Sequence, residues 1–325
     1  MHAVIIGAGA LGRTFGVHLA SAGATVSFLV RPERMADRSA YVVEPLNGRR
    51  AALALPQPQR VVRIPDDASL LLLAVRREQM HESLQGLLQD APAVPLIALT
   101  PLLPESETRL AGLIQGPCLV ALPTVAARTD GERTQFFIPP FAKTLIESEL
   151  GQPEIVQQLI DALNRAKLPC AWSRGVRRRN PATTIAFYPL TLGLSLAGSM
   201  DRFTRDGEVY PLTRKAVREA LALAARIGPV TPPLRIALRF ANATLLRLAM
   251  RTARLLAPAV TELLEEHFAV KLVAQHRVLG EEILELARQH GTHMPALASL
   301  LERAPAALPG PRAAVATLSA RHADD

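Results

Sequence analysis

The sequence predicts an α/β fold in which an N-terminal domain built on a parallel sheet is followed by an all-α C-terminal domain. Apolar strands alternate with helical patterns through the first half of the chain, and helical patterns alone fill the second half. A glycine-rich segment joins the first strand to the first helix. Buried strands that alternate with helices are typical of a parallel sheet covered on both faces. We therefore expect two domains, over residues 1–170 and 171–325.

The glycine-rich segment has the spacing of a dinucleotide-binding turn. It reads Gly7-Ala8-Gly9-Ala10-Leu11-Gly12, directly after the apolar residues 4–6. In such a turn Gly7 permits the tight bend, Gly9 leaves room for a pyrophosphate, and Gly12 lets the helix pack close to the strand. The N–H groups that open the helix attract the phosphates. We expect this segment to bind a dinucleotide in a Rossmann-type domain; the alternative is a packing turn without a ligand.

The end of the second strand indicates which dinucleotide is bound. Sites for NAD usually place Asp or Glu there to bind the ribose 2′-hydroxyl. This chain has Arg31 at that point and Arg34 three residues later, and a guanidinium group suits a 2′-phosphate. The pattern favours NADP(H), bound through Arg31 and Arg34. Two alternatives remain: both arginines lie in a solvated loop, or Glu33 binds the ribose.

Apolar runs and turn residues predict the other elements of the first domain. Strands are expected at residues 2–6, 25–30, 70–75, 95–99 and 118–122, and helices at 10–22, 78–88, 105–113 and 151–167. Residues 134–138 and 142–147, separated by Pro139-Pro140, are expected to pair as two strands at the sheet edge. The chain is expected to cross into the second domain at residues 168–173.

The second domain is predicted to be helical throughout. Helices are expected at residues 181–198, 211–227, 234–256, 259–289 and 295–304, and Pro189 is expected to kink the first of them or to begin a new one. One face of the helix at 234–256 carries Arg235, Arg239, Arg247, Arg251 and Arg254. A basic amphipathic helix can rest on a membrane, but it is more often a packed domain helix or a dimer contact. We expect no membrane contact, and a homodimer formed through the helical domain.

The composition bears on partners and location. The net charge is +8, but the basic residues are scattered, aromatic residues make up only 4%, and no nucleic-acid-binding motif is present. The charge therefore fits a phosphorylated cofactor and a carboxylate substrate, and no nucleic acid is expected. Cys118 and Cys170 match no metal or redox pattern, and no metal site is expected. With neither a signal peptide nor a spanning segment in view, we expect a cytoplasmic protein.

Four stretches give the chain a resemblance to the ketopantoate reductase (2-dehydropantoate 2-reductase) family. They are Gly7-Ala8-Gly9-Ala10-Leu11-Gly12 with Gly16, Phe28-Leu29-Val30-Arg31, Leu72-Leu73-Ala74-Val75-Arg76, and the segment from Tyr188-Pro189-Leu190-Thr191 to Gly291-Thr292-His293-Met294-Pro295. The resemblance implies a Rossmann domain, a helical domain, an active site in the cleft between them, and reduction of a 2-keto acid by NADPH. It also implies that Arg76, at the position of a family lysine, contacts the cofactor phosphate or the substrate carboxylate; the alternative is a surface role.

The chain departs from this family where the family's catalytic residues stand. The family's lysine and two asparagines, counted back from Pro-Leu-Thr, fall here on Asn180, Thr184 and Tyr188. A shift of one residue would put Arg179 in the lysine's place. Arginine supplies charge but not a proton, and asparagine donates only a neutral hydrogen bond, whereas Tyr188 could act as an acid. Arg179, Asn180 and Tyr188 are therefore the candidate catalytic residues, against the alternatives of a solvated helix start and a core tyrosine.

These patterns together predict an NADPH-dependent oxidoreductase that reduces a small 2-keto acid or a related carbonyl compound. Ketopantoate itself is not the expected substrate, because the lysine position is not filled by lysine. The alternative is a catalytically inactive dinucleotide-binding protein, a sensor or a partner, that kept the fold.

Overall fold

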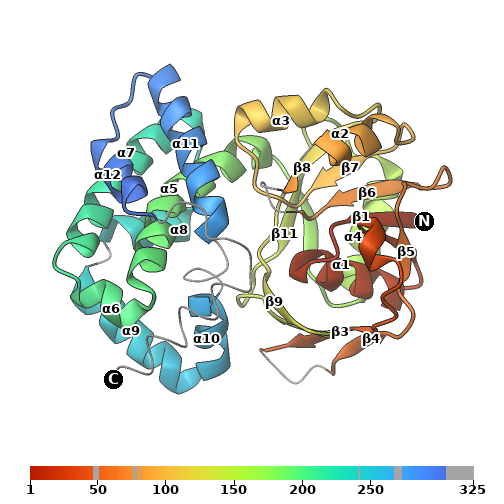
Figure 1. Ribbon diagram of the computed structural model, residues 1–325, viewed down its shortest axis with the longest axis horizontal. Coiled ribbons are helices and arrows are strands. Elements are labelled where there is room, and N and C mark those ends of the chain that lie inside the picture. The colour runs from red at the N-terminus through yellow and green to blue at the C-terminus, as the bar shows by residue number, and fades with distance from the viewer. Residues whose placement is uncertain (47–50, 76–78, 81, 241, 267–272, 305–325) are drawn as a thin grey trace.

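The computed structural model describes residues 1–46, 51–75, 79–80, 82–240, 242–266 and 273–304. Sheets and their covering helices form one half of the molecule, and helices alone form the other half (Figure 1). The predicted fold class, an α/β N-terminal region followed by a helical C-terminal region, is confirmed. The division at residue 170 stays a prediction; the last strand of the sheet ends at Ser173 and the next helix begins at Val176.

An eight-stranded sheet forms the centre of the N-terminal half. Its strands are β1 (His2–Ile6), β2 (Thr25–Leu29), β5 (Gln59–Val61), β6 (Leu70–Leu73), β7 (Leu96–Ala98), β8 (Cys118–Leu122), β11 (Thr144–Glu147) and β12 (Cys170–Ser173), in the order β12-β11-β8-β7-β6-β1-β2-β5. All neighbouring pairs from β5 to β8 are parallel, and β11 alone runs antiparallel to its neighbour β8. The chain therefore reverses its direction of winding between β1 and β6.

Helices cover both faces of this sheet. They are α1 (Ala10–Ser21), α2 (Glu82–Gln89), α3 (Pro104–Ala111) and α4 (Glu154–Arg165). Alternate strand residues point to opposite faces: Ile5 packs in one core with residues of α1 and α4, whereas Val4 and Ile6 pack in another with residues of α2 and α3. Burial on both faces explains why the strands read as continuous apolar runs in the sequence.

A second, four-stranded sheet packs on the other side of α1. It consists of β3 (Tyr41–Pro45), β4 (Leu53–Leu55), β9 (Ala126–Asp130) and β10 (Arg133–Phe137), in the order β4-β3-β10-β9. Helix α1 contacts β1 and β2 as well as all four strands of the small sheet, and therefore lies between the two sheets (Figure 1). Eight consecutive residues of α1, from Gly12 to Leu19, are buried in consequence.

The predicted strand pair on either side of Pro139-Pro140 is wrong. Strand β10 lies in the small sheet and β11 lies in the large one. Both edges of β10 are occupied, because β9 pairs with it through a tight turn at Gly131 and β3 pairs with its other side. No edge is left to receive β11, which instead adds to β8 and β12.

The C-terminal half consists of helices in the described residues. They are α5 (Val176–Ala197), α6 (Met200–Arg205), α7 (Val209–Ile227), α8 (Pro232–Phe240), α9 (Ala243–Leu256), α10 (Pro258–Glu266), α11 (Val273–Gln289) and α12 (Pro295–Glu302). Helices α5 and α7 form the centre, with α12 packed on both, around a core that includes Ile185, Leu223 and Leu297. Helix α5 begins five residues before the expected start and includes both Pro181 and Pro189 without ending.

The predicted single helix over residues 234–256 is also wrong. Helix α8 ends at Phe240, and Asn242 caps a new helix because its side-chain oxygen accepts a hydrogen bond from the N–H of Leu245 at 2.9 Å. The five arginines are therefore divided between two helices, with two on α8 and three on α9. Of the predicted helix at 259–289, the structure describes α10 and α11, and residues 267–272 between them lie outside the described residues.

A buried ion cluster fastens the start of α5 to the large sheet. The Arg177 guanidinium bonds the carboxylates of Glu107 on α3 and Glu147 on β11, with Nε 2.7 Å from Glu147 Oε2, and also donates to the Cys118 carbonyl at 2.8 Å. Glu147 is fully buried and Glu107 nearly so. Two buried carboxylates need such a cation, because an unpaired buried charge is costly.

We predict that Arg177→Ala lowers the free energy of unfolding by about 3 kcal/mol, because it leaves two buried carboxylates without their cation. Urea denaturation followed by circular dichroism measures the loss. The control is Arg174→Ala, at an exposed position three residues earlier, which should change the free energy by about 0.5 kcal/mol or less. Equal effects of the two substitutions would show that the cluster does not stabilise the fold.

Candidate dinucleotide-binding and active site

The glycine turn lies where the winding of the sheet reverses. It follows β1, whose neighbours are β2 and β6. Gly7 has a φ of 106°, and a Cβ atom on it would lie 2.9 Å from Val75 Cγ1 and 3.0 Å from the Ala74 backbone, just beyond β6. A Cβ atom on Gly12 would lie 1.9 Å from the Gly7 carbonyl oxygen. Such a reversal point is where open α/β sheets bind their ligands.

The first turn of α1 is open to a ligand. Gly9 is the N-cap, is exposed and supplies no side-chain cap, and the first turn holds no acidic residue. The first N–H groups of a helix have no acceptor within it, so those that follow Gly9 can donate to a phosphate. A Cβ atom on Gly9 would meet nothing within 4 Å. The structure thus brings Gly7, Ala8, Gly9, Ala10, Leu11 and Gly12 together around an open helix start.

Arg13 stabilises the glycine turn through hydrogen bonds. The sequence did not predict this role. The Nε of Arg13 donates to the Ala8 carbonyl at 3.0 Å and its Nη1 to the Gly131 carbonyl at 2.8 Å. The guanidinium lies 4.2 Å from the ring centre of Tyr41, and that of Arg60 lies 5.0 Å from the same ring. Burial lowers the pKa of Arg13, and the carbonyl and ring contacts compensate for that burial. The available signal was an arginine directly after the glycine motif, inside a helix whose neighbouring residues are mostly apolar.

Arg31 and Arg34 lie at the carboxyl end of β2, beside the glycine turn. Arg31 precedes a short 3₁₀ helix, Pro32–Arg34, and both arginines are exposed, as is Glu33. Asp37, three residues after Arg34, accepts hydrogen bonds from Ser39 and lies 3.6 Å from Arg60. The Ser39 bonds, helped by Arg60 and Arg34, lower the pKa of Asp37. Arg76, the remaining predicted cofactor contact, lies outside the described residues.

Asn180 and Arg179 lie at the start of α5, next to the large sheet. Asn180 is fully buried, and its Nδ2 donates to the Ala121 carbonyl on β8 at 2.9 Å. The hydroxyl of Thr184 lies 3.5 Å from Asn180 Oδ1. Arg179 is half-buried on the neighbouring face of the helix. The side-chain amide of Asn180 is thus used in a hydrogen bond to the end of β8. Arg179 lies at the border between the two halves.

Tyr188 lies two turns further along α5, in the core of the helical region. Its hydroxyl donates to the His276 carbonyl at 2.5 Å, and burial raises its pKa. Gly280 packs against this hydroxyl so closely that a Cβ atom there would be 2.4 Å away. Eight residues of helix separate Tyr188 from Asn180, about 12 Å along the axis. The structure therefore does not bring Tyr188 and Asn180 to the same place.

Two threonines extend the site along the carboxyl edge of the sheet. Thr100 follows β7, and its hydroxyl donates to the Val75 carbonyl at 2.5 Å, which links two strand ends. Thr124 follows β8, three residues after the carbonyl that Asn180 contacts, and its hydroxyl is buried without a hydrogen-bond partner in the described part of the chain. Buried hydroxyls normally have partners, so Thr124 is a further candidate for ligand contact. Its sequence context gave no signal for this.

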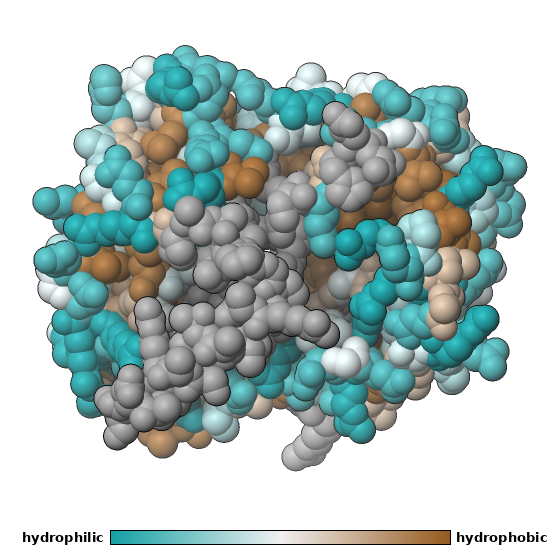
Figure 2. Space-filling view, viewed as in Figure 1, coloured by the Kyte–Doolittle hydropathy of each residue, from teal (hydrophilic) through white to brown (hydrophobic). Residues whose placement is uncertain are grey.

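The described residues hold no group of three or more His, Cys, Asp or Glu side chains arranged for a metal ion. Among the same residues, no helix is both long enough and apolar enough to span a bilayer. On the face seen in Figure 2, apolar residues show in separate patches among hydrophilic ones.

Comparison with known proteins supports the family resemblance. Residues 3–96 match the family model described as ketopantoate reductase PanE/ApbA. No curated protein sequence matches the chain. The resemblance drawn from the N-terminal motifs is thereby confirmed over the region that contains the glycine turn, Arg31 and β6.

Solved structures share the fold over almost the whole chain. A PanE/ApbA family ketopantoate reductase from Ralstonia eutropha JMP134 has a TM-score of 0.68 and 19% identity, covering 93% of this chain and 96% of that one. A 2-dehydropantoate 2-reductase from Geobacter metallireducens GS-15 has a TM-score of 0.67 and 18% identity, covering 94% and 100%. A D-mandelate dehydrogenase, solved with NADH and anilino(oxo)acetate, has a TM-score of 0.61 and 15% identity, covering 94% and 97%. These matches show the two-part fold.

We predict that Gly9→Val abolishes binding of both NADPH and NADH and leaves the fold intact. The added side chain enters space that is empty in this structure but that a pyrophosphate needs. Isothermal titration calorimetry measures binding, and thermal unfolding followed by circular dichroism measures stability. The control is Gly86→Val, where a Cβ atom also meets nothing within 4 Å, and it should bind both nucleotides normally. Normal binding by Gly9→Val would show that no diphosphate occupies this turn.

Proposed function

We propose that this chain is an NADPH-dependent oxidoreductase that reduces a small 2-keto acid or a related carbonyl compound in the cytoplasm. The observation that carries the proposal is the uncapped, exposed start of α1 at the reversal point of the sheet, with an arginine pair at the neighbouring strand end. The family match over residues 3–96 supports the same function. A homodimer formed through the helical region belongs to the proposal as well.

The residues present fit a phosphorylated dinucleotide. The N–H groups after Gly9 would donate to the diphosphate, and Arg13 keeps the Ala8 peptide in place below it. Arg31 and Arg34 would hold the 2′-phosphate, because both are exposed at the end of β2 and no acidic residue stands at the strand tip itself. A guanidinium can form two charge-assisted hydrogen bonds to one phosphate.

Residues at the border of the two halves would stabilise the carbonyl oxygen during the reduction. NADPH would supply a hydride to the carbonyl carbon, and the oxygen that becomes negative needs a cation or donors nearby. Of the three candidates on α5, we assign this role to Arg179, because Asn180 and Tyr188 both donate to backbone carbonyls. Arginine does not release its proton, so the proton comes from solvent in this proposal. Thr124 would donate a hydrogen bond to the substrate.

We predict that Arg31→Ala weakens NADPH binding tenfold or more and leaves NADH binding nearly unchanged. The expected size follows from the loss of charge-assisted hydrogen bonds to one phosphate. Titration calorimetry with each nucleotide measures the two dissociation constants. Arg38→Ala, which changes an exposed arginine later in the same loop, is the control and should preserve both. If the substitution weakens the binding of NADPH and the binding of NADH equally, Arg31 does not contact the 2′-phosphate.

We predict that the purified protein oxidises NADPH in the presence of at least one member of a panel of 2-keto acids and aldehydes. Loss of absorbance at 340 nm measures the reaction. Arg179→Ala should lower kcat by about a hundredfold, the usual effect of removing one oxyanion donor, with unchanged NADPH affinity. Tight NADPH binding without turnover of any compound in the panel would favour the catalytically inactive dinucleotide-binding protein instead.

A further inference from the structure

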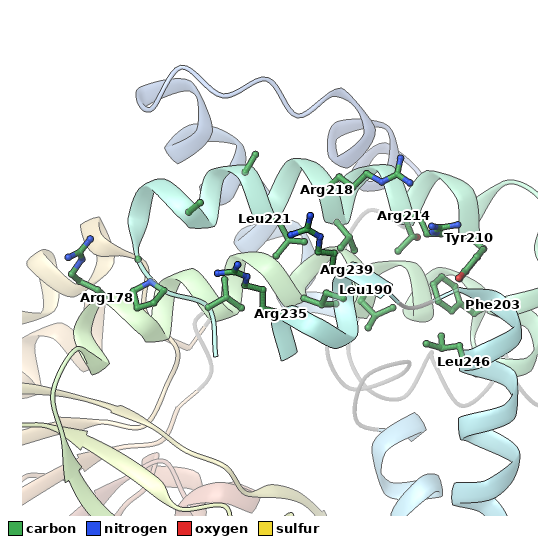
Figure 3. Close-up of a pocket in the computed structure, with 18 residues that line it drawn as sticks. Arg178, Leu190, Phe203, Tyr210, Arg214, Arg218, Leu221, Arg235, Arg239 and Leu246 are labelled. Carbon is green, nitrogen blue, oxygen red and sulfur yellow. The ribbon is translucent and has the colours of Figure 1, made fainter. Parts of the chain in front are cut away.

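Arginines gather in two different surroundings in this molecule. A hollow of about 820 Å³ lies along α7 in the helical half (Figure 3). The arginines that line it are all exposed: Arg178, Arg214, Arg218, Arg235 and Arg239. Water solvates exposed cations and weakens their interactions, so their charge alone does not indicate a bound anion. Arg13 differs from them, because it is buried and contacts the glycine turn.

Arg13 is a buried cation that forms no ion pair in the described part of the chain. It is 7% exposed. Its hydrogen bonds go to the carbonyl groups of Ala8 and Gly131, its guanidinium lies against the ring of Tyr41, and Asp37 acts on it only at longer range. A buried charge is normally paired with one of opposite sign. Arg13 therefore keeps a positive charge directly behind the glycine turn.

The hydrogen bond from Arg13 fixes the direction of one peptide group in the glycine turn. The peptide between Ala8 and Gly9 is trans, so its C=O and its N–H point in opposite directions. The Ala8 carbonyl accepts from Arg13 Nε at 3.0 Å and therefore points toward a buried side chain. The Gly9 N–H then points away from that side chain, and Gly9 is exposed. Among the described residues this N–H has no acceptor.

We propose that Arg13 is a positioning residue, which directs the Gly9 N–H at the diphosphate of the dinucleotide as a donor in addition to those of the first turn of α1. Arg13 itself does not touch the cofactor. Its charged hydrogen bond polarises the peptide between Ala8 and Gly9, which makes the N–H a stronger donor. The diphosphate in turn brings negative charge close to a buried cation. This role rests on the dinucleotide site proposed above, and it does not depend on the reduction of any substrate.

A second buried arginine separates this role from a purely structural one. Arg13 also joins the glycine turn to the small sheet, because it bonds the Gly131 carbonyl between β9 and β10. The Arg60 guanidinium lies 5.0 Å from the centre of the same Tyr41 ring, and its side chain is 5% exposed. It donates to the Ser39 carbonyl at 2.8 Å instead of to the glycine turn. Arg60 therefore matches Arg13 in burial and in its ring contact, but has no bond to the turn.

Titration calorimetry with ADP-ribose, NADH and NADPH tests the proposal on the full-length protein. All of these ligands contain the diphosphate, and ADP-ribose lacks both the nicotinamide and the 2′-phosphate. Arg13→Met should weaken the binding of each by the same factor of about ten, the usual size for one hydrogen bond to a charged group. Arg13→Lys keeps the charge without the planar fork of donors and should recover part of the affinity. Arg60→Met is the control and should bind ADP-ribose like the parent.

The amide signal of Gly9 gives a readout that a purely structural role would not change. In protein with isotope-labelled glycine, Gly9→Ala identifies this signal by its loss, and the added Cβ atom meets nothing within 4 Å. Saturating ADP-ribose should move the Gly9 amide proton downfield in the parent and in Arg60→Met. The movement should be smaller in Arg13→Met and in Arg13→Lys, and the second variant carries the test if the first does not fold.

Three results would overturn the role of Arg13. They are parent-like binding of ADP-ribose by the Arg13 variants, equal losses of affinity in Arg13→Met and Arg60→Met, and a Gly9 signal that does not respond to ADP-ribose. A parent protein that binds no dinucleotide would overturn both this role and the proposed function. A parent protein that binds ADP-ribose and NADPH as expected, but oxidises NADPH with no carbonyl compound, would overturn the reductase function alone.

Discussion

The closeness of α1 to β1 is the constraint on which the rest of the N-terminal half depends. Gly12 allows it, because any side chain there would collide with the Gly7 carbonyl. Gly16, one turn later, meets the Phe28 ring in the same way. This approach lets α1 lie between two sheets, and it holds the start of the helix at the strand end where an anion is attracted. The fold and the candidate binding site therefore both depend on the absence of a side chain at Gly12 and at Gly16.

Arginine also serves this protein as a structural residue. Arg13 bonds two backbone carbonyls and lies against an aromatic ring, and Arg177 bonds one carbonyl and two buried carboxylates. Each joins segments that are distant in sequence, through several donors of one planar group. In this chain, therefore, an arginine is not by itself an indication of an anion-binding site.

The sequence predicted β1, α1 and β2 well because their signals are local. The glycine spacing, the continuous apolar runs and the arginine at the strand end all lie within the first 31 residues. Strands β3 and β4 were missed because they are short and partly exposed, and the partners of β10 and β11 depend on edges that distant segments occupy. The break before α9 depends on a single cap at Asn242. For the candidate site, the backbone turn could be predicted, and a core position of Tyr188 was one of the two alternatives. The roles of Arg13 and Thr124 could not be predicted, because they depend on how distant segments pack.

The two halves of the molecule share one long helix, whose first turn is fixed to the sheet and whose later turns form the helical core. Pro181 follows directly after the anchoring residues Arg177 and Asn180, and Pro189 lies two turns beyond it. Neither can donate a helical hydrogen bond, so the carbonyls of Arg177 and Ile185 lose their usual partners within α5. Helix α5 therefore resists bending least at Pro181 and Pro189. Any movement of the helical half relative to the sheet would then swing about Pro181, while the Arg177 cluster stays with the sheet.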